Sequence, residues 1–335
     1  MKDNRISISH GSGGKKTNKL IKNLFLKHFK NPGLERLEDS FEFPVENTRL
    51  AITVDSHVVY PLFFPGGDIG KLSINGTLND LAVKGARGIF ITAGFLIREG
   101  LKMETLEKIV SSMAKEAKKS MVKIVAGDTK VIEAGEKEEI YITTTGFGVI
   151  EYDIVLSYES ISPGDKVIIT GSVGDHEASV ILAREDFGLK YKIESDTQNI
   201  YPLLEELFKE RVNIKFARDP TRGGIAGVLN EISEKTDFGF VIEEEKIPVK
   251  EEVRGVCDFL GTEPWYMACE GRAVIIVSQE DAPKTLGILK KHPQGRDAQI
   301  IGEVVEKPFG VWLKTPLKTT RALIWIEGEQ LPRIC

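Results

Sequence analysis

Three of four candidate carboxylates stand at the end of a predicted strand or at the start of a loop, which is where proteins commonly hold a divalent cation. Asp55 ends an apolar strand, and Asp80 follows Asn79 within a predicted helix. Asp128 ends the strand VKIVAGD, and Asp219 opens the loop RDPTRGG. Each alone is equally consistent with a helix N-cap or a turn residue. Together they predict a site for Mg²⁺, which prefers carboxylate oxygens and bridges nucleotide phosphates.

Glycine-rich turns at predicted strand–helix junctions are candidate phosphate cradles, because the first backbone N–H groups of a helix bind anions. Neither common nucleotide motif occurs: GGDIGKL resembles a P-loop, but Pro65 replaces its first glycine and Leu72 its Ser or Thr. Each turn taken singly is also consistent with an ordinary tight turn. The candidate turns are HGSGG at 10–14, PGGDIG at 65–70, GSVGD at 171–175 and RDPTRGG at 218–224.

Several side chains could move protons beside such a site. Lys130 lies two residues after Asp128, and Glu270 precedes a very apolar strand, so it is expected to be partly enclosed. An isolated histidine near a turn is commonly a hydrogen-bonded structural residue. The histidine candidates are His10, His57 and His176.

The three cysteines indicate a chain without a disulfide framework. Cys257 and Cys269 lie within predicted elements, and Cys335 is the last residue. Such a sparse, odd count is typical of a reducing cytoplasm. A thiol at the end of a segment that contains proline and glycine could serve as a carrier group, although chain ends are commonly without function. The neighbouring carboxylate and Arg333 have opposite effects on the thiolate, so the pattern predicts an ordinary thiol.

Composition predicts a folded chain of two domains. The 335 residues are 41% hydrophobic and 28% charged, and the net charge is −5. This balance argues against nucleic-acid binding, and the Lys-rich stretch 15–30 is interpreted as a solvated helix face. No apolar run reaches membrane-spanning length and none follows the N-terminal residues, so neither a membrane span nor a signal peptide is expected. The predicted location is the cytoplasm.

Hydrophobic periodicity predicts helices and strands in both halves of the chain, with a connector near residue 155. We expect an N-terminal segment 1–40, domains at 41–153 and 154–311, and a flexible tail 312–335. The predicted helices span 15–30, 71–83, 103–119 and 225–235. The predicted strands span 49–60, 122–128, 139–150, 166–171, 238–242, 273–277 and 298–304.

These motifs, in this order, resemble the HypE family of hydrogenase maturation proteins. The resemblance covers residues 8–335 and rests on HGSGG, the long block 53–86, IVAGDTKV, GSVGDH, RDPTRGG and the terminal PRIC. This family belongs to the PurM-like superfamily of AIR synthetase, selenophosphate synthetase and thiamine-monophosphate kinase. The resemblance implies a two-domain α+β PurM-like fold with an α/β-type C-terminal domain and a flexible tail. It also implies a homodimer whose N-terminal domains pair into a barrel, with strands 49–60 and 139–150 at the interface.

The resemblance further implies an ATP-dependent carbamoyl dehydratase. The carbamoyltransferase HypF would load Cys335, ATP and Mg²⁺ would drive conversion of the S-carbamoyl group to S-cyanate, and a HypC–HypD complex would receive the cyanide ligand for the iron of [NiFe]-hydrogenase. The implied catalytic residues are Cys335, Lys130 and Glu270. The implied ATP-binding residues are Asp55, Lys71, Asn79, Asp80, Asp128, Thr129, Gly174 and Asp219. The implied metal ligands are Asp55, Asp80, Asp128 and Asp219.

The chain departs from the family pattern at three positions. Cys269 stands where relatives often have Asn, and Ser12 where they often have Ala. The early acidic pair is replaced by Glu38-Asp39-Ser40, so Asp39 is not expected to bind metal. Two other functions stay open: a carrier that only presents Cys335 to partners, and a related ATP-dependent enzyme acting on a free small molecule. The complete set of carboxylates argues against the first, and the terminal thiol argues against the second.

Overall fold

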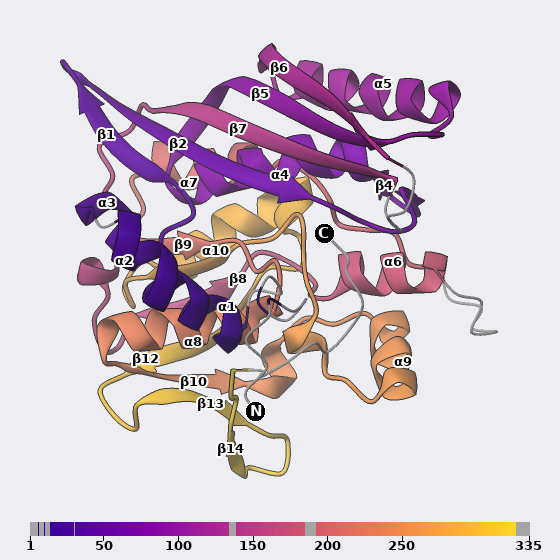
Figure 1. The fold of residues 1–335 in the computed structure, drawn as a ribbon. Coiled ribbons are helices and arrows are strands. Elements are labelled where there is room, and N and C mark those ends of the chain that lie inside the picture. Colours follow the sequence, from indigo (N-terminus) through magenta and orange to yellow (C-terminus); the bar gives the residue numbers. More distant parts are fainter. Residues whose placement is uncertain are drawn as a thin grey trace.

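Two sheets, each covered by helices, are stacked on one another (Figure 1). The computed structural model describes residues 6, 10, 14–29, 31–133, 139–184 and 192–325. Cys335 with the PRIC motif, and the middle of HGSGG, therefore lie outside the described residues. No helix of the described part is long and apolar enough to cross a bilayer.

The N-terminal sheet has five strands in the order β1-β2-β7-β5-β6. Its neighbours pair antiparallel, except that β5 and β6 run parallel. The strands are β1 Phe41–Val45, β2 Thr48–His57, β5 Ala86–Arg98, β6 Lys123–Ile132 and β7 Ile140–Ile150, and a small separate ribbon pairs β3 Phe63–Phe64 with β4 Gly67–Asp68. No strand was predicted over 86–98, yet β5 is central to this sheet. Its glycines interrupt the apolar pattern on which the prediction rested.

Helix α4, Ile69–Val83, is the core helix of this half. Asp68 caps it by accepting hydrogen bonds from the backbone N–H groups of Gly70 (2.8 Å) and Lys71 (3.0 Å), an arrangement worth about 1 kcal/mol. The helix is buried on nearly all sides, because it lies between the N-terminal sheet and the second domain. Helix α5, Met103–Lys119, packs beside it with one apolar face. Both helices match their predicted ranges closely.

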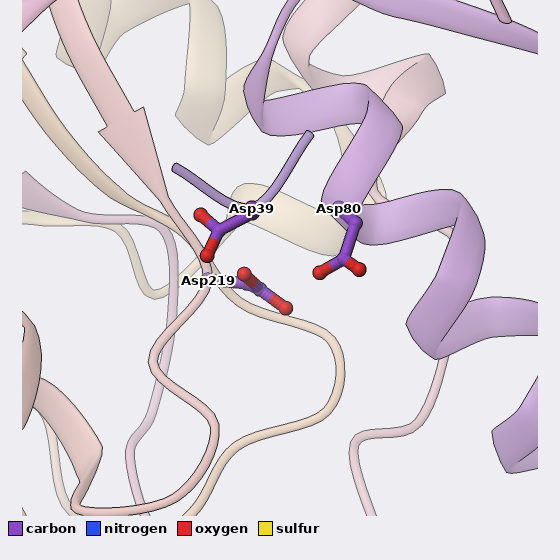
Figure 2. Close-up of side chains that lie close together, drawn as sticks. All are labelled: Asp39, Asp80 and Asp219. Carbon is purple, nitrogen blue, oxygen red and sulfur yellow. The ribbon is translucent and has the colours of Figure 1, made fainter. Parts of the chain in front are cut away.

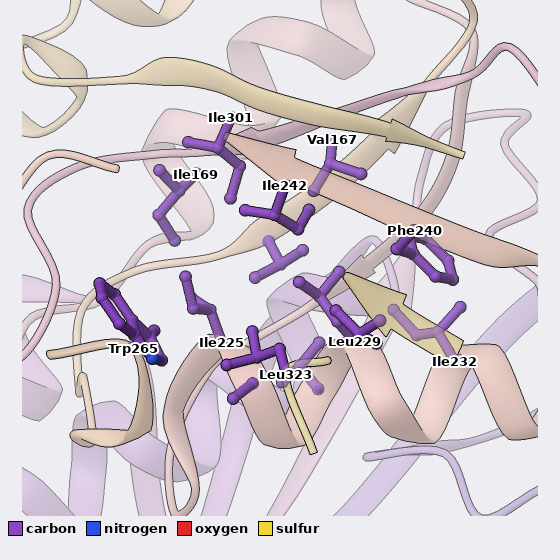
Figure 3. Packing of buried hydrophobic residues seen from close by; sticks show 14 of the residues in the cluster. Val167, Ile169, Ile225, Leu229, Ile232, Phe240, Ile242, Trp265, Ile301 and Leu323 are labelled. Atoms are coloured by element: carbon purple, nitrogen blue, oxygen red, sulfur yellow. The ribbon is translucent and has the colours of Figure 1, made fainter. Parts of the chain in front are cut away.

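The C-terminal sheet has seven strands in the order β14-β13-β10-β12-β8-β11-β9. Val167, Ile169 and Ile276 on this sheet pack with Ile225 and Leu229 of α8, forming the main core of this half (Figure 3). The strands are β8 Lys166–Ile169, β9 Ile214–Arg218, β10 Gly239–Glu243, β11 Val274–Val277, β12 Gln299–Val305, β13 Gly310–Lys314 and β14 Thr320–Ala322. The helices are α6 Asp175–Arg184, α7 Tyr201–Lys209, α8 Gly224–Thr236, α9 Glu251–Leu260 and α10 Ala282–Lys291, with short 3₁₀ turns η3 Tyr158–Ser160, η4 Glu244–Lys246, η5 Pro264–Tyr266 and η6 Pro293–Gly295.

A chain of short helices precedes the first sheet and lies against α8. The predicted helix 15–30 is present as α1 Lys15–Leu20, a π-helical turn η2 Ile21–Phe25 and α2 Leu26–Phe29, followed by α3 Pro32–Glu35. Lys22 pairs with Glu234 of α8 at 3.2 Å, and Lys235 donates to the backbone carbonyl of Glu35. This segment therefore bridges towards the second domain.

The expected tail 312–335 begins too early. Residues 310–314 and 320–322 are strands of the C-terminal sheet, and Val311, Leu313 and Leu323 are buried in its core. The physical reason is a parallel pairing of β13 with β10, about seventy residues earlier, which local periodicity does not reveal. The tail expectation is thus wrong for residues 312–323.

Candidate active site

Three aspartates from distant parts of the sequence converge between the two sheets. Asp39 precedes β1, Asp80 lies on α4 and Asp219 directly follows β9, and one carboxylate oxygen of each lies within 4.8 Å of the others (Figure 2). Asp80 and Asp219 were predicted metal ligands. Asp39 was not expected to bind metal, yet the structure places its carboxylate in this cluster.

Neighbouring polar groups hold two of the three carboxylates, those of Asp39 and Asp80. The Thr53 hydroxyl lies 2.7 Å from both the Asp39 carbonyl oxygen and Asp80 Oδ2. The Ser40 hydroxyl donates to the Asp80 carbonyl at 2.6 Å, and Arg218 pairs with Asp39 at 2.9 Å. The cluster is therefore rigidly held in this chain.

The cluster carries negative charge that Arg218 neutralises only in part. Burial, followed by the charge of Asp39, raises the pKa of Asp219 to about 8. Burial and the charges of Asp219, Asp55 and Asp39 raise the pKa of Asp80 well above its usual range. Burial also raises the pKa of Asp39, although Arg218 opposes this. Buried like charges of this kind are stable together only with protons or a cation.

The cluster forms one wall of a pocket of about 370 Å³ with an excess of acidic groups. Six carboxylate side chains line it: Asp39, Asp55, Asp80, Asp219, Glu231 and Glu270. Arginine contributes only Arg218 and Arg222. Such a pocket repels a bare phosphate and accepts one only together with cations.

Gly76 of α4 packs closely against three residues that line the same pocket. A Cβ atom on Gly76 would lie 3.0 Å from His57, 3.4 Å from Asp55 Oδ2 and 3.8 Å from Glu270 Oε2. Asp55 and His57 are two residues apart on β2 and so face the same side of the strand, towards α4. Burial lowers the pKa of His57, and burial with nearby carboxylates raises that of Glu270 well above its usual range. Glu270 is only 4% exposed, as its sequence context predicted.

Three predicted residues lie away from this pocket, on the edge strand β6. Asp128 and Lys130 pair with each other at 3.0 Å, and their side chains are 71% and 67% exposed. The bond from Lys130 lowers the pKa of Asp128, the opposite of the buried aspartates. Thr129 lies between them, also exposed. Within one chain, the structure does not bring these residues to the acidic pocket.

Lys71, Asn79 and Gly174 also lie outside the lining of the pocket. The Lys71 ammonium donates to the Gly66 carbonyl at 2.7 Å, and burial lowers its pKa. Asn79 is 1% exposed, and its amide is fully hydrogen-bonded to backbone groups. The Gly174 N–H donates to the sulfur of Cys269 at 3.4 Å, so the cysteine in place of the usual Asn serves as a buried backbone partner.

The prediction missed several lining residues besides Asp39. Arg218 immediately precedes Asp219, and Thr221 and Arg222 belong to the same RDPTRGG loop, so the motif contained them. Glu231 lies on α8 and has no sequence signal of its own, because only its ion pair with Arg218 (2.9 Å) connects it to the site.

The comparisons with known proteins agree with this architecture. The model for the AIR synthase related protein N-terminal domain matches residues 38–150, and that for the C-terminal domain matches residues 162–314. Carbamoyl dehydratase HypE of Azotobacter vinelandii is 42% identical over 337 residues, covering 100% of this chain and 98% of that protein.

Solved structures give the same relationship. A structure of a HypE–HypF complex matches with a TM-score of 0.86 and 44% identity, covering 92% of this chain and 99% of the matched chain. A structure of HypE in complex with ATP matches with a TM-score of 0.82 and 40% identity, over 99% and 100% of the two chains. With a PurM-like fold, the acidic pocket and identity along its whole length, the chain belongs to the HypE family of carbamoyl dehydratases, within the AIR synthase-related proteins.

Proposed function

We propose that this chain uses ATP to dehydrate a carbamoyl group on its own Cys335, forming a cyano group for hydrogenase maturation. Membership of the HypE family gives the reaction class, ATP-dependent carbamoyl dehydration. The observation that carries the proposal to this chain is the acidic pocket, where buried aspartates with raised pKa values lie beside the enclosed Glu270.

The acidic cluster fits Mg²⁺. Its donors are all carboxylate oxygens, they converge from three parts of the chain, and Arg218 compensates only part of their charge. Asp39, Asp80 and Asp219 would hold the cation, with Asp55 at the same pocket available to a second one. A bound Mg²⁺ would neutralise phosphate charge and align the γ-phosphate for transfer.

The proposed reaction balances as follows. The carbonyl oxygen of the thiocarbamate forms a bond to the γ-phosphorus, the bond from that phosphorus to ADP breaks, and one N–H proton leaves. The carbon–oxygen bond then breaks, phosphate departs with that oxygen, and the second N–H proton leaves as the C≡N bond forms. The products are thiocyanate, ADP, phosphate and one released proton.

Glu270 is proposed to receive a proton from the carbamoyl nitrogen. A buried carboxylate with a raised pKa is a stronger base than an exposed one, once ionised, and Glu270 lines the acidic pocket. Closure of the site would protect the phosphorylated intermediate from water.

We further propose that a homodimer completes the site, since Lys130 and Asp128 have no route to the pocket within one chain. Apolar side chains are exposed on the outer face of the N-terminal sheet and along β6, including Val54, Phe90, Leu96, Val125 and Val131. Such a face suits burial against a second copy, whose β6 would bring Lys130 and Asp128 to the pocket. β2 and β7 are interior strands and would meet the partner only through this face.

HypF is the proposed donor of the carbamoyl group, since a related chain forms a complex with it. A HypC–HypD complex is the proposed acceptor of the cyano group. Both buried cysteines, Cys257 and Cys269, are thiols without a disulfide, which supports the proposed cytoplasmic setting.

The test is mass spectrometry of the C-terminal peptide after incubation with HypF, carbamoyl phosphate, ATP and Mg²⁺. We expect a carbamoyl adduct on Cys335 without ATP and a cyano adduct with it. Cys335→Ala should form neither and still bind ATP, whereas Cys257→Ser and Cys269→Ser should form both. A carbamoyl adduct that persists in the presence of ATP would instead support a carrier without dehydratase activity.

A further inference from the structure

The loop that carries Glu270 is held by a backbone clamp, and we infer that Asp196 and Asn79 are the positioning residues that keep this carboxylate in its reactive place. The inference rests on the proposed role of Glu270 as proton acceptor. It concerns residues that do not line the acidic pocket, and it acts through Glu270 rather than on the substrate.

Both backbone polar groups of Glu270 are bound by side chains from other elements. Its N–H donates to Asp196 Oδ1 at 3.0 Å. Its carbonyl oxygen accepts from Asn79 Nδ2 at 3.1 Å. Asp196 is 9% and Asn79 1% exposed, so these bonds are shielded from competing water.

Asp196 belongs to residues 192–200, a segment without helix or strand that threads between the two domains. The Ser195 N–H donates to the Pro65 carbonyl at 2.8 Å, and Gln198 Nε2 donates to the Gly271 carbonyl at 3.2 Å. A Cβ atom on Gly271 would lie 1.9 Å from the Asp196 carbonyl oxygen, so only glycine permits this close approach. We define residues 195–200 as the strap.

Asn79 connects the strap to α4. Its Nδ2 donates to the Gln198 carbonyl at 3.1 Å as well as to Glu270, and its Oδ1 accepts from the Ile200 N–H at 3.0 Å. Both amide hydrogens are thereby used. Asn79 therefore holds backbone in place, in contrast to its predicted role in ATP binding.

Asn79 is adjacent in sequence to a residue of the acidic cluster, so it links the Glu270 loop to that cluster. The next residue on α4 is Asp80, a member of the acidic cluster, so one helix fixes both the cluster and the Glu270 loop. The two parts of the reaction, phosphoryl transfer and proton removal, are thus held at a constant separation. A shift of Glu270 by about 1 Å would slow proton removal by about 100-fold without weakening nucleotide binding.

The experiment compares Asp196→Leu with Asp196→Asn in the full-length chain, preloaded with the carbamoyl group by HypF. Leu keeps the branched outline of Asp, although it is larger, and cannot accept the Glu270 N–H bond, whereas Asn is isosteric with Asp and keeps an acceptor oxygen. Conversion to the cyano form is followed in a single turnover by intact mass across a range of pH, and ATP affinity is measured by calorimetry. We expect Asp196→Leu to convert about 30-fold or more slowly with ATP affinity unchanged, and Asp196→Asn to restore most of the rate.

A double variant separates positioning from general damage. If Asp196 acts through Glu270, Asp196→Leu should add little to the defect of Glu270→Gln. Multiplicative defects in the double variant would overturn the inference. Where Asp196→Leu does not fold, Asn79→Ser, whose side chain is too short for the same three bonds, is tested in the same way.

The outcomes also distinguish the clamp from the proposed function. If Glu270→Gln converts slowly while a folded Asp196→Leu converts at the parental rate, the positioning role of Asp196 is overturned and the proposed role of Glu270 stands. Parental conversion by Glu270→Gln would remove the proposed role of Glu270 and the clamp with it.

Discussion

The chain places acidic side chains in two contrasting settings. In the pocket, Asp80 and Asp219 are buried among like charges, and their pKa values are raised. On the edge strand β6, Asp128 is exposed and bonded to Lys130, and its pKa is lowered. Asp80 and Asp219 therefore lie among charges that repel their own, whereas Asp128, predicted for the same metal and nucleotide site, is neutralised by Lys130.

The difference indicates which part of the site one chain can build. The excess of negative charge in the pocket favours the binding of a cation there. The Asp128–Lys130 pair on β6 has no such excess, since each charge is already paired with the opposite charge. This pair can act in catalysis only if it lies against the pocket of another molecule. The proposed second copy of the chain provides that pocket.

The largest effect is expected from Asp80→Asn. The substitution removes one of three converging ligands at unchanged shape, so Mg²⁺·ATP-dependent conversion should fall by about 100-fold or more. Single-turnover conversion of the preloaded chain measures it. Circular dichroism should match the parent, and the defect should ease at high Mg²⁺. Parental conversion would show that the cluster is not the metal site.

The next effect is the restoration of activity on mixing two inactive variants, and it tests the proposed dimer directly. Asp80→Asn and Lys130→Ala chains should each be nearly inactive. If every site combines the pocket of one chain with β6 of the other, one site of each mixed dimer is intact. Unfolding and refolding the two variants together should then restore about a quarter of the parental activity, because half the dimers are mixed. No rescue would mean that Lys130 acts within its own chain or not at all.

Local patterns in the sequence predicted much of the pocket. Asp55, Asp219 and Glu270 stand near strand ends or glycines and Asp80 within a predicted helix, and the structure brings these four together. Glu231 could not be predicted, because its place depends on packing of α8 against β9 and on the pairing with Arg218. Asp39 was excluded on a comparison of motifs, although its carboxylate is present and pairs with Arg218, and Thr53 holds its backbone carbonyl at the site.

Fold prediction failed where pairing is remote in sequence. Helices α4 and α5 were predicted within two residues of their ends, since their signals are local: Asp68 caps α4, and α5 has one apolar face. Strand β5 was missed because it is glycine-rich, and β13 because its partner β10 is far away in the chain. Edge strand β6 was predicted, but its exposure on both faces depends on the order of the sheet.

A smaller effect is expected on stability. Asp219 has a pKa of about 8 when folded and about 4 when unfolded, so the folded state holds a proton that the unfolded state loses in this window. Without Mg²⁺, the melting temperature should therefore fall by a few degrees as pH rises from about 5 to about 8.5. Mg²⁺ should reduce this fall by stabilising the ionised carboxylates, and Asp219→Asn should flatten it. A melting curve indifferent to both changes would contradict the charge balance described for the cluster.

The smallest effect on the melting temperature is expected from Asp128→Asn. A negligible shift would show that the β6 ion pair does not support the fold. An exposed ion pair is screened by solvent and contributes little to folding, so neither Asp128→Asn nor Lys130→Gln should shift the melting temperature measurably at any pH. Asp80→Asn, by contrast, should raise the melting temperature in the absence of Mg²⁺, because it removes one buried like charge. Differential scanning fluorimetry of the three variants, with EDTA and with Mg²⁺, measures the contrast. A loss of stability on changing Asp128, equal to that of a core substitution, would mean that the β6 pair supports the fold. The low conversion expected of Lys130→Ala would then reflect damage to β6, and the proposed approach of that strand to a partner's pocket would lose its support.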